Sequence, residues 1–448
     1  MWEVVFPQRL FEDMRSMLFS NAPSENGCFL LANSYTRSKD RQVMLITEMT
    51  QPSSSSWKYG SEHSLEPSSS FINDAVVRAD SSNLSVLFVH THPNPLHPTG
   101  FSPIDKHSNN KLFATISEIL PKRPVGSLVL SRSGIDGDVF ANKKLHRLSR
   151  VSTVGRTISV LERAGAKPAK EHADARFDRQ IKSIGKTRHA QLRRLSASVV
   201  GVGGTGSAVA IQLARMGLGQ LRLVDMDTID RSNLSRVYGS RASDIGKAKV
   251  DVIKRHIAGF SDAKIDTRRA DITKRNMVPD LVDSDVIFGC TDNLASRAIL
   301  NDISVQYCIP LIDVGCRILL NKDDSINQAV VKVQVVTPAN ACLWCTGTLN
   351  GVAIMQESLP ESEKKKLAEE GYYKSVGKQP SIISITTLAG SVAVNKLLNL
   401  LGVFGQDYST RTQLELRDNI LNDDTPPISE KCVCRKRVGL ADERRIVN

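Results

Sequence analysis

The amino-acid sequence predicts an α/β protein of two domains, an α+β domain followed by a Rossmann-like, doubly wound and mostly parallel sheet. The first observation is the length, because 448 residues exceed what one hydrophobic core usually organises. The second is that strand-like and helix-like segments follow one another irregularly up to about residue 145. The third is their regular alternation from about residue 197, which is typical of a parallel sheet covered by helices.

In the first part, residues 8–20 carry apolar side chains at helical spacing. The stretch QPSSSSWKYGSEHSLEPSSS is too polar to pack and is predicted to be a surface loop. The strand-like segments lie on either side of a second predicted helix, INDAVVRADSS, and read GCFLLANSY, QVMLITEMT, LSVLFVHTHP, GSLVLSRSG and IDGDVFAN. We predict a domain over residues 1–145, followed by a basic linker over 146–175.

The second predicted domain covers residues 176–448. Its strand-like segments are SVVGVG, QLRLVDMD, KIDTRRAD, DVIFGCTDN and IPLIDVGCR. The helix-like segments between them are GSAVAIQLARMG, KAKVDVIKRHIAGF and ASRAILNDISVQYC. This order predicts a sheet whose ligands bind beyond the carboxyl ends of its strands.

The composition indicates a soluble globular protein, with 41% hydrophobic and 24% charged residues. No apolar run reaches the length of a membrane span, and the acid-containing N-terminal segment differs from a secretory signal, so we expect a cytoplasmic protein without a membrane partner. The formal net charge of +12 raises nucleic acid as a partner. There is no zinc-finger spacing or RNA-binding aromatic motif, and aromatic residues make up only 5%, so we expect none.

A glycine-rich turn predicts a nucleotide site. Gly201, Gly203 and Gly206 form G-x-G-x-x-G between a predicted strand and a predicted helix. Glycines there allow a tight turn and close backbone approach, and the helix N-terminus offers N–H groups to phosphate oxygens. Asp225 ends the next strand, where it can accept hydrogen bonds from ribose hydroxyls. These residues alone fit a dinucleotide site and another use of the motif equally.

The residues that follow favour ATP. Asn233, Arg236 and Lys249 supply polar and cationic groups that hydride transfer does not need. An enzyme that expels pyrophosphate from ATP does need them, because negative charge must be held while the α-phosphorus is attacked. Asp292, in GCTDN at the end of a strand, can hold the Mg²⁺ that bridges the phosphates.

From residue 176 to about 434 the chain resembles the ubiquitin-activating-enzyme and ThiF/MoeB/HesA superfamily of adenylyltransferases. The resemblance rests on RFDRQIKSIG, VVGVGGTGS, LVDMDTIDRSNLSR, GKAKV, CTDN and two cysteine pairs. It implies Mg-ATP-dependent adenylation of the C-terminal carboxylate of a ubiquitin-like protein. It assigns Gly204 to the phosphate loop and Arg179 to the ATP site of a partner subunit, which implies a homodimer.

The same resemblance assigns Asp225 to the ribose and Asp292 to magnesium, with Asn233, Arg236 and Lys249 on the phosphates. The chemistry is consistent, because the attacking carboxylate is already ionised near neutral pH and needs no general base. Catalysis then reduces to positioning and charge neutralisation.

Eight cysteines divide into two groups. Cys342, Cys345, Cys432 and Cys434 form the pairs CLWC and CVC, which in a cytosolic chain favour a metal over disulfides. The resemblance implies a structural zinc there, although the second pair is C-x-C where the family has C-x-x-C. The others, Cys28, Cys290, Cys308 and Cys316, lie in apolar surroundings and are expected in the core.

No thioester nucleophile can be named in the usual place, because residues 346–387 contain no cysteine. Cys316 is the nearest alternative, in a strand that we predict to be buried. The adenylate would then pass to a partner's cysteine or to a sulfur donor.

A second site is predicted from FVHTHPNPLHPTGFSPID. His90, His92 and Asp105 are two imidazoles and a carboxylate, a ligand set that leaves one position on zinc open to water, as catalytic sites require. Zinc would lower the pKa of that water. Solvent-facing loop histidines are the alternative interpretation.

Residues 1 to about 145 resemble the JAB/MPN domain with its JAMM motif, an upstream glutamate followed by H-x-H-P and S-x-x-D. The resemblance implies Glu25 as general base and then acid, and Ser102 as oxyanion stabiliser. Glu48 competes with Glu25, and His97 is a minor rival ligand in a loop about two residues longer than the family pattern. JAMM enzymes cleave peptide or isopeptide bonds at the C-terminus of ubiquitin-like proteins.

The two resemblances together predict a bifunctional enzyme of a prokaryotic ubiquitin-like pathway, by analogy one tied to antiphage defence. One domain would process or remove the modifier, and the other would adenylate it and pass it to a ubiquitin-conjugating-type partner. One alternative is adenylation for sulfur transfer in cofactor biosynthesis, or peptide modification. In a second, the JAMM domain only docks the modifier. The modifier, its targets and the order of the two reactions stay open.

Overall fold

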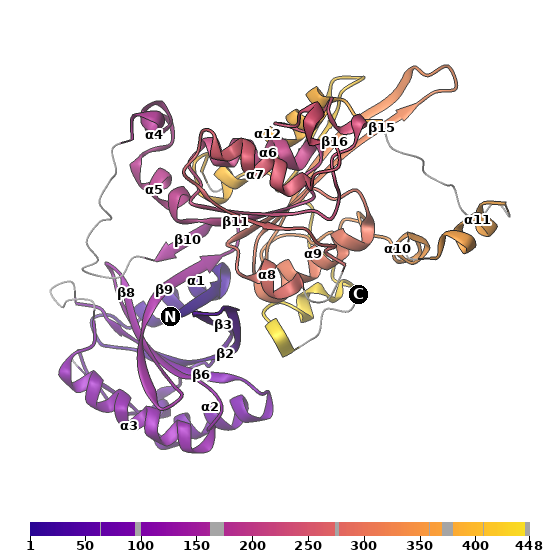
Figure 1. Cartoon of the computed structure of the whole chain (residues 1–448). Coiled ribbons are helices and arrows are strands. Elements are labelled where there is room, and N and C mark those ends of the chain that lie inside the picture. Colours follow the sequence, from indigo (N-terminus) through magenta and orange to yellow (C-terminus); the bar gives the residue numbers. More distant parts are fainter. Residues whose placement is uncertain are drawn as a thin grey trace. The chain divides into compact units, whose positions relative to one another are not determined.

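The computed structural model describes residues 1–443 except 63, 95–99, 162–173, 274–276, 358, 370–379 and 406. The chain forms two compact units (Figure 1). The N-terminal unit contains Met1–Ala169 together with Gln306–Cys308 and Arg437–Arg445. Most of the remainder forms the second unit, made of Lys170–Val305 and Ile309–Lys436.

The N-terminal unit is built on a sheet with the strand order β1-β3-β2-β6-β7-β8-β9-β10. A parallel pairing between β1 and β9 closes most of these strands into a ring. The strands of the sheet are β1 (Trp2–Pro7), β2 (Gly27–Ser38), β3 (Arg41–Met49), β6 (Ser85–His92), β7 (Val125–Ser131), β8 (Ile135–Ala141), β9 (Lys144–Val154) and β10 (Ile158–Leu161). A separate hairpin joins β4 (Trp57–Gly60) to β5 (Leu65–Pro67).

Both faces of this sheet are covered, because alternate residues of its strands are apolar on each side. Leu30 and Leu87 pack with α1 (Gln8–Phe19), whereas Phe29 and Phe88 pack with α2 (Ser69–Ser81) and α3 (Pro103–Ile119). Odd-numbered residues of β2 and even-numbered residues of β6 therefore point to the side of α2 and α3. Figure 1 shows these two helices together on one side of the sheet.

The prediction of a linker over 146–175 is wrong over its first part, because residues 146–154 lie in β9 and residues 158–161 form β10. Leu148, Val151 and Val154 of β9 are buried, and β9 pairs with β1. The interpretation as a linker followed the basic residues, but Arg147 lies on the outside of a strand, with 58% of its side chain exposed.

The second unit holds the predicted doubly wound sheet, in the order β13-β12-β11-β14-β15-β16-β17-β18. Its first five strands are parallel, and β16, β17 and β18 add antiparallel pairs. The strands are β11 (Ser196–Val200), β12 (Gln220–Val224), β13 (Lys264–Arg268), β14 (Val286–Gly289), β15 (Leu311–Leu320), β16 (Ile326–Val336), β17 (Arg411–Glu415) and β18 (Ile420–Asp424).

Helices cover both faces of this sheet, with α6, α7 and α12 on one side and α8 and α9 on the other (Figure 1). The helices are α4 (Asp178–Ile184), α5 (Lys186–Arg194), α6 (Gly204–Arg215), α7 (Lys249–Ala258), α8 (Val278–Val282), α9 (Leu294–Tyr307), α10 (Gly351–Glu357), α11 (Glu361–Glu369) and α12 (Ile383–Leu400). Strand order reverses between β11 and β14, so the crevice beyond their carboxyl ends is the expected ligand position.

One helix, α12, is long and apolar enough to cross a membrane by length and composition alone. In this structure α12 packs on α6, β15 and β16, and Ala389, Ala393 and Leu397 are fully buried. A Cβ at Gly390 would lie 3.1 Å from Ala208 of α6, so the two helices approach closely. The helix therefore belongs to the core of the second unit.

Candidate functional sites

The glycine-rich turn joins β11 to α6 at the strand-order reversal. Gly201 has φ of +84°, and a Cβ there would lie 2.6 Å from the carbonyl oxygen of Cys290. A Cβ at Gly206 would lie 1.8 Å from the carbonyl oxygen of Gly201. The turn is therefore packed so closely against its own backbone and the end of β14 that only glycine fits. α6 begins at Gly204, and its N-cap Gly203 has no side-chain cap, so the N–H groups of its first turn are available for a phosphate.

Two charged groups stand beside this turn. Asp225, just after β12, accepts the N–H of Val202 at 2.8 Å and that of Asp227 at 2.8 Å. Burial raises the pKa of Asp225, and nearby Lys249 opposes that rise. Lys249 begins α7, and its Nζ donates to Asp227 at 2.7 Å and lies 3.9 Å from Asp225. A carboxylate that can accept from ribose hydroxyls and a cation that can bind phosphate thus lie together at the ends of β11 and β12.

The remaining predicted nucleotide residues lie in the segments that follow. Asn233 is buried, and its Oδ1 accepts the N–H of Asp230 at 3.2 Å, so it shapes its own turn. Arg236 donates to the carbonyl oxygen of Ser232 at 2.7 Å. Asp292 is exposed just beyond β14, and Arg179 is exposed on α4. Of the predicted set, Lys249 and Asp225 lie 3.9 Å apart. The side chains of Asn233 and Arg236 bond within their own turn, and Asp292 and Arg179 are exposed beyond β14 and on α4.

Sequence reasoning missed one carboxylate near Asp292. Glu357 of α10 accepts the N–H of Leu294 at 2.7 Å and that of Ala295 at 3.3 Å, so it caps the N-terminus of α9. Behind it Arg297 of α9 pairs with the buried Asp313. Glu357 is separated by 63 residues from Leu294, and no local pattern in the sequence points to this contact.

Cys316, the alternative nucleophile, lies on β15 with its Sγ 3.7 Å from Oγ1 of Thr205. Burial raises the pKa of the Cys316 thiol. The reactive thiolate form is therefore disfavoured, which argues against a thioester role.

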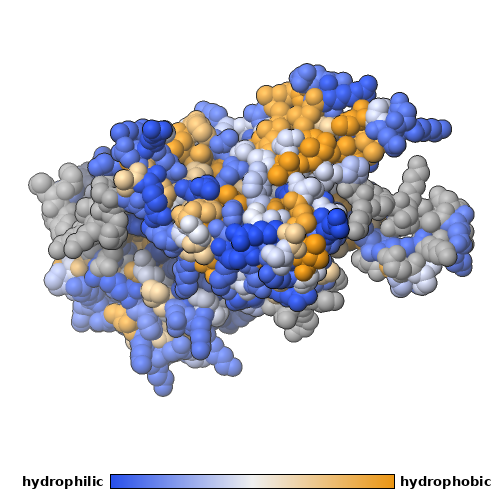
Figure 2. All heavy atoms as spheres, turned by 45° about the horizontal axis from the view of Figure 1, so that its top comes forward, coloured by the Kyte–Doolittle hydropathy of each residue, from blue (hydrophilic) through white to orange (hydrophobic). Residues whose placement is uncertain are grey.

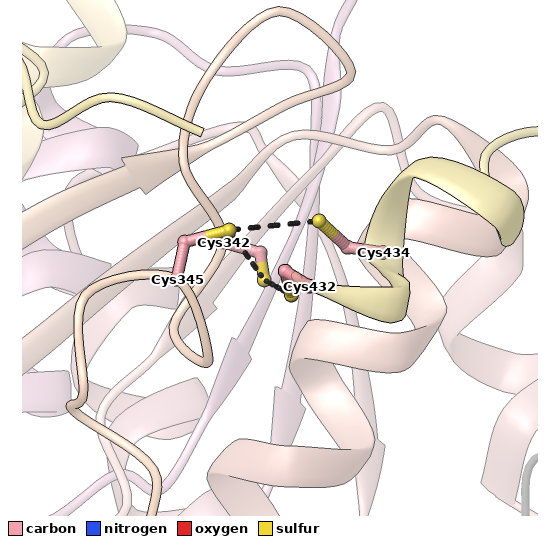
Figure 3. A group of neighbouring side chains, drawn as sticks. All are labelled: Cys342, Cys345, Cys432 and Cys434. Carbon is pink, nitrogen blue, oxygen red and sulfur yellow. Dashed lines mark hydrogen bonds between the residues drawn. The ribbon is translucent and has the colours of Figure 1, made fainter. Parts of the chain in front are cut away.

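The four late cysteines come together although 86 residues separate the two pairs (Figure 3). The Sγ atoms of Cys342 and Cys345, of Cys342 and Cys432, and of Cys345 and Cys434 are each 3.6 Å apart. A disulfide needs about 2.05 Å, whereas a tetrahedron of Zn–S bonds of about 2.3 Å places its sulfur atoms roughly 3.8 Å apart. The donor set and spacing fit a closed structural zinc, and the short C-x-C pair does not prevent it.

We expect Cys432→Ser to lose roughly one equivalent of zinc and to lower the melting temperature, because three thiolates no longer close the tetrahedron. Elemental analysis and thermal unfolding of the purified full chain measure both. Cys28→Ala is the matched control, since Cys28 is a buried thiol of the N-terminal unit outside the cluster. Equal zinc content in Cys432→Ser and the wild type would contradict the assignment.

A second group of polar side chains gathers in the N-terminal unit. His90 and His92 lie on β6 and Asp105 lies in the first turn of α3; their ligand atoms all fall within 4.8 Å of one another. Nε2 of His90 is 3.4 Å and Nε2 of His92 is 3.3 Å from the carboxylate of Asp105. Glu25 is buried, with Oε1 3.6 Å from Nε2 of His92. Two imidazoles and a carboxylate at this spacing fit a metal ion, with a second carboxylate beside it.

Ser102 orients Asp105. Its hydroxyl accepts the N–H of Asp105 at 3.1 Å, and its own N–H donates to the Asp105 carboxylate at 2.7 Å, which is a capping box at the start of α3. Burial raises the pKa of Asp105, but the hydrogen bonds from His90, His92 and Ser102 outweigh it and hold that pKa well below the usual range. These hydrogen bonds hold the Asp105 carboxylate in its ionised form beside the two histidines.

The structure describes one of the two alternative residues, Glu48, but not the other, His97. Glu48 of β3 pairs with Arg78 of α2 at 2.5 Å and is 39% exposed, and it does not belong to the metal-binding group. His97 and the other residues of the lengthened loop, 95–99, lie outside the described residues. The geometry therefore favours Glu25 over Glu48.

A family model described as the ThiF family matches residues 177–435. The adenylyltransferase and sulfurtransferase MOCS3 of Anopheles gambiae is 34% identical over 141 residues, which are 31% of this chain and 32% of that protein. The ubiquitin-activating enzyme E1-like protein of Saccharomyces cerevisiae is 33% identical over 134 residues, 30% of this chain and 21% of that one. The chain thus spans about a third or less of the length of these relatives.

Two solved structures resemble the chain more distantly. One is Escherichia coli MccB and the other is the microcin C7 biosynthetic enzyme MccB. MccB with ATP has a TM-score of 0.46 and 20% identity, covering 59% of this chain and 75% of that one. MccB in complex with N-formylated MccA has a TM-score of 0.48 and 19% identity, covering 60% and 77%.

Proposed function

Since this chain belongs to the ThiF family, we propose that its second unit uses Mg-ATP to adenylate the C-terminal carboxylate of a ubiquitin-like protein. The observation that carries the proposal is the contact of Asp225 and Lys249 beside the glycine turn at the end of β11. Backbone N–H groups of the turn and of α6 face the phosphates, and Asp225 accepts from the ribose hydroxyls.

In this reaction the substrate carboxylate attacks the α-phosphorus of ATP, an acyl O–P bond forms, and pyrophosphate leaves with the electron pair of the broken P–O bond. No proton has to be removed, because the carboxylate is already ionised. Lys249 neutralises phosphate charge, and Asn233 and Arg236 are candidates for the same role after Arg236 releases Ser232. Asp292 would hold magnesium, which supplies further charge neutralisation when bound.

A protein-sized substrate is supported by an apolar surface on this unit. Large apolar side chains are exposed at the ends of β15, β16 and β18, and Figure 2 shows apolar residues gathered over this part of the sheet. They are Leu320, Ile326, Ile420 and Leu421, which are 39% to 61% exposed. Ile420 and Leu421 are consecutive residues of β18 and point to opposite faces, so exposed apolar side chains lie on both faces of this part of the sheet. Exposed apolar side chains of this kind fit contact with a folded partner.

The test is ATP–pyrophosphate exchange by the full chain. A ubiquitin-like protein with a free C-terminal glycine should support exchange, and the same protein with a C-terminal amide should not. Exchange with a short peptide alone would favour peptide modification. Exchange with none of these acceptors would reject the proposal.

We propose an external acceptor for the acyl group, because residues 346–387 contain no cysteine and burial raises the pKa of the Cys316 thiol. We favour a cysteine of a ubiquitin-conjugating-type partner. The alternative is sulfur transfer, which the name of the Anopheles gambiae relative includes. A thioester formed on an added conjugating-type protein would support the first, and a thiocarboxylate formed only with a sulfur donor would support the second.

For the N-terminal unit we propose a JAB/MPN-type zinc peptidase that acts on the same C-terminal tail, as precursor or as conjugate. The convergence of Glu25, His90, His92 and Asp105 supports it. The two histidines and Asp105 would hold zinc, which when bound polarises the scissile carbonyl and acidifies water. Glu25 takes the proton of the attacking water and hands it to the leaving amine, and Ser102 donates to the carbonyl oxygen.

A further inference from the structure

Thr91 stands between His90 and His92 but faces the other way. Its side chain is fully buried, and because successive residues of a strand point to opposite faces, it points toward α1 while the histidines point toward α3. It therefore cannot touch the metal-binding group directly.

Thr91 instead holds the backbone of the residue that follows Glu25. Its Oγ1 accepts the N–H of Asn26 at 3.1 Å and donates to the carbonyl oxygen of Asn26 at 3.3 Å. The N–H of Thr91 donates to the same carbonyl at 2.9 Å. One residue thus binds both polar groups of the Asn26 backbone.

The strand register explains why this matters for Glu25. Gly27 of β2 pairs with His90 of β6 in the antiparallel ladder. Continuing that register past the end of β2 places Asn26 opposite Thr91 and Glu25 opposite His92. At Asn26 the Thr91 hydroxyl accepts the backbone N–H. A side-chain hydrogen bond thus extends the pairing of β2 with β6 by one residue. The Glu25 carboxylate then lies on the histidine face, 3.6 Å from Nε2 of His92.

We propose that Thr91 is a positioning residue that fixes the reach of the Glu25 carboxylate toward the group held by His90, His92 and Asp105. The inference rests on the proposed peptidase function. Glu25 precedes β2, and its own N–H donates to the carbonyl oxygen of Ser61 at 2.9 Å, beside the β4–β5 hairpin. Without the Thr91 hydroxyl the Asn26 N–H loses its partner, and the Glu25 backbone gains freedom.

The chain supplies a matched control. Thr50 makes the same pattern of contacts with Phe29: its Oγ1 accepts the Phe29 N–H at 2.9 Å and donates to the Phe29 carbonyl at 3.1 Å, and its N–H donates to that carbonyl at 2.8 Å. Thr50 follows β3 and does not belong to the metal-binding group. Thr50→Val therefore removes an equivalent pair of hydroxyl contacts from Phe29, within β2.

The experiment compares Thr91→Val, Thr91→Ser and Thr50→Val in the full chain. We expect Thr91→Val to lower kcat for precursor cleavage roughly 10- to 100-fold with little change in KM, because the base is misplaced but the substrate still binds. Thr91→Ser keeps the hydroxyl and should restore kcat, and Thr50→Val should match the wild type. Zinc affinity, measured by chelator competition, should be unchanged in all three.

Amide hydrogen exchange of the zinc-free protein gives a measurement independent of activity. The peptide that contains Asn26 should exchange faster in Thr91→Val than in Thr91→Ser or the wild type. Should Thr91→Val fail to fold, Thr91→Ala makes the same comparison. Equal kcat in Thr91→Val and Thr50→Val, or unchanged exchange at Asn26, would overturn the inference. A wild-type chain that cleaves nothing would reject the proposed peptidase instead, and exchange at Asn26 would still decide whether the Thr91 contacts exist.

Discussion

Glu25→Gln is expected to lower the rate of tail cleavage about 10³-fold or more while zinc stays bound. Glutamine has the shape of glutamate but cannot take a proton from water or return one to the leaving amine. Glu25 is buried beside His92, at 3.6 Å from its Nε2, and is not needed to complete the set of His90, His92 and Asp105. The measurement is mass spectrometry of a ubiquitin-like precursor that carries residues beyond its terminal glycine.

The matched control is Glu48→Gln. Glu48 is an acid on the neighbouring strand β3, and its partner is Arg78 of α2, so cleavage should persist near the wild-type rate. Loss of cleavage in Glu48→Gln with retention in Glu25→Gln would reverse the assignment. If the wild type binds the precursor but cleaves nothing, the unit serves as a docking module only.

The two sites differ in how far the sequence could predict them. His90, His92, Ser102 and Asp105 fall within 16 residues, and the helix cap at Ser102 is itself a local signal, so the group is visible in the sequence. The place of Glu25 depends on the register between β2 and β6, which neighbouring residues do not encode. Family resemblance selected Glu25, and the ladder from Gly27 and His90 supplies the physical reason.

The main errors in the predicted fold concern contacts between residues that are far apart in the sequence. The alternation from β11 to β15 was predicted because each parallel strand is a short apolar run followed by a helix. The prediction missed β1, whose partners β3 and β9 are distant in the sequence, and it took the basic start of β9 for a linker. It also missed α12, whose apolar residues surround the helix and leave no amphipathic pattern.

Asp292→Ala is expected to abolish ATP–pyrophosphate exchange, a loss of at least about 10³-fold, with the melting temperature unchanged. Asp292 is exposed beyond β14, so removing its carboxylate costs no packing. It is the carboxylate that we propose for magnesium, and the transition state then keeps uncompensated phosphate charge. Asp418→Ala is the control, because Asp418 is an exposed acid that pairs with Arg417 near β18. Exchange at the wild-type rate in Asp292→Ala would show that magnesium is held elsewhere.

The same variant tests the homodimer that the family resemblance implies. If Arg179 of one subunit completes the ATP site of the other, Arg179→Ala is also inactive alone. In a mixed dimer, the site on the Arg179→Ala subunit retains its own Asp292 and receives Arg179 from its Asp292→Ala partner. Equal mixing with free exchange of subunits makes half of the dimers mixed, each with one complete site, so about a quarter of the wild-type activity should return. No recovery on mixing, in a sample shown to exchange subunits, would mean that Arg179 acts within its own chain or not at all, and the exposed position of Arg179 on α4 would then need another explanation.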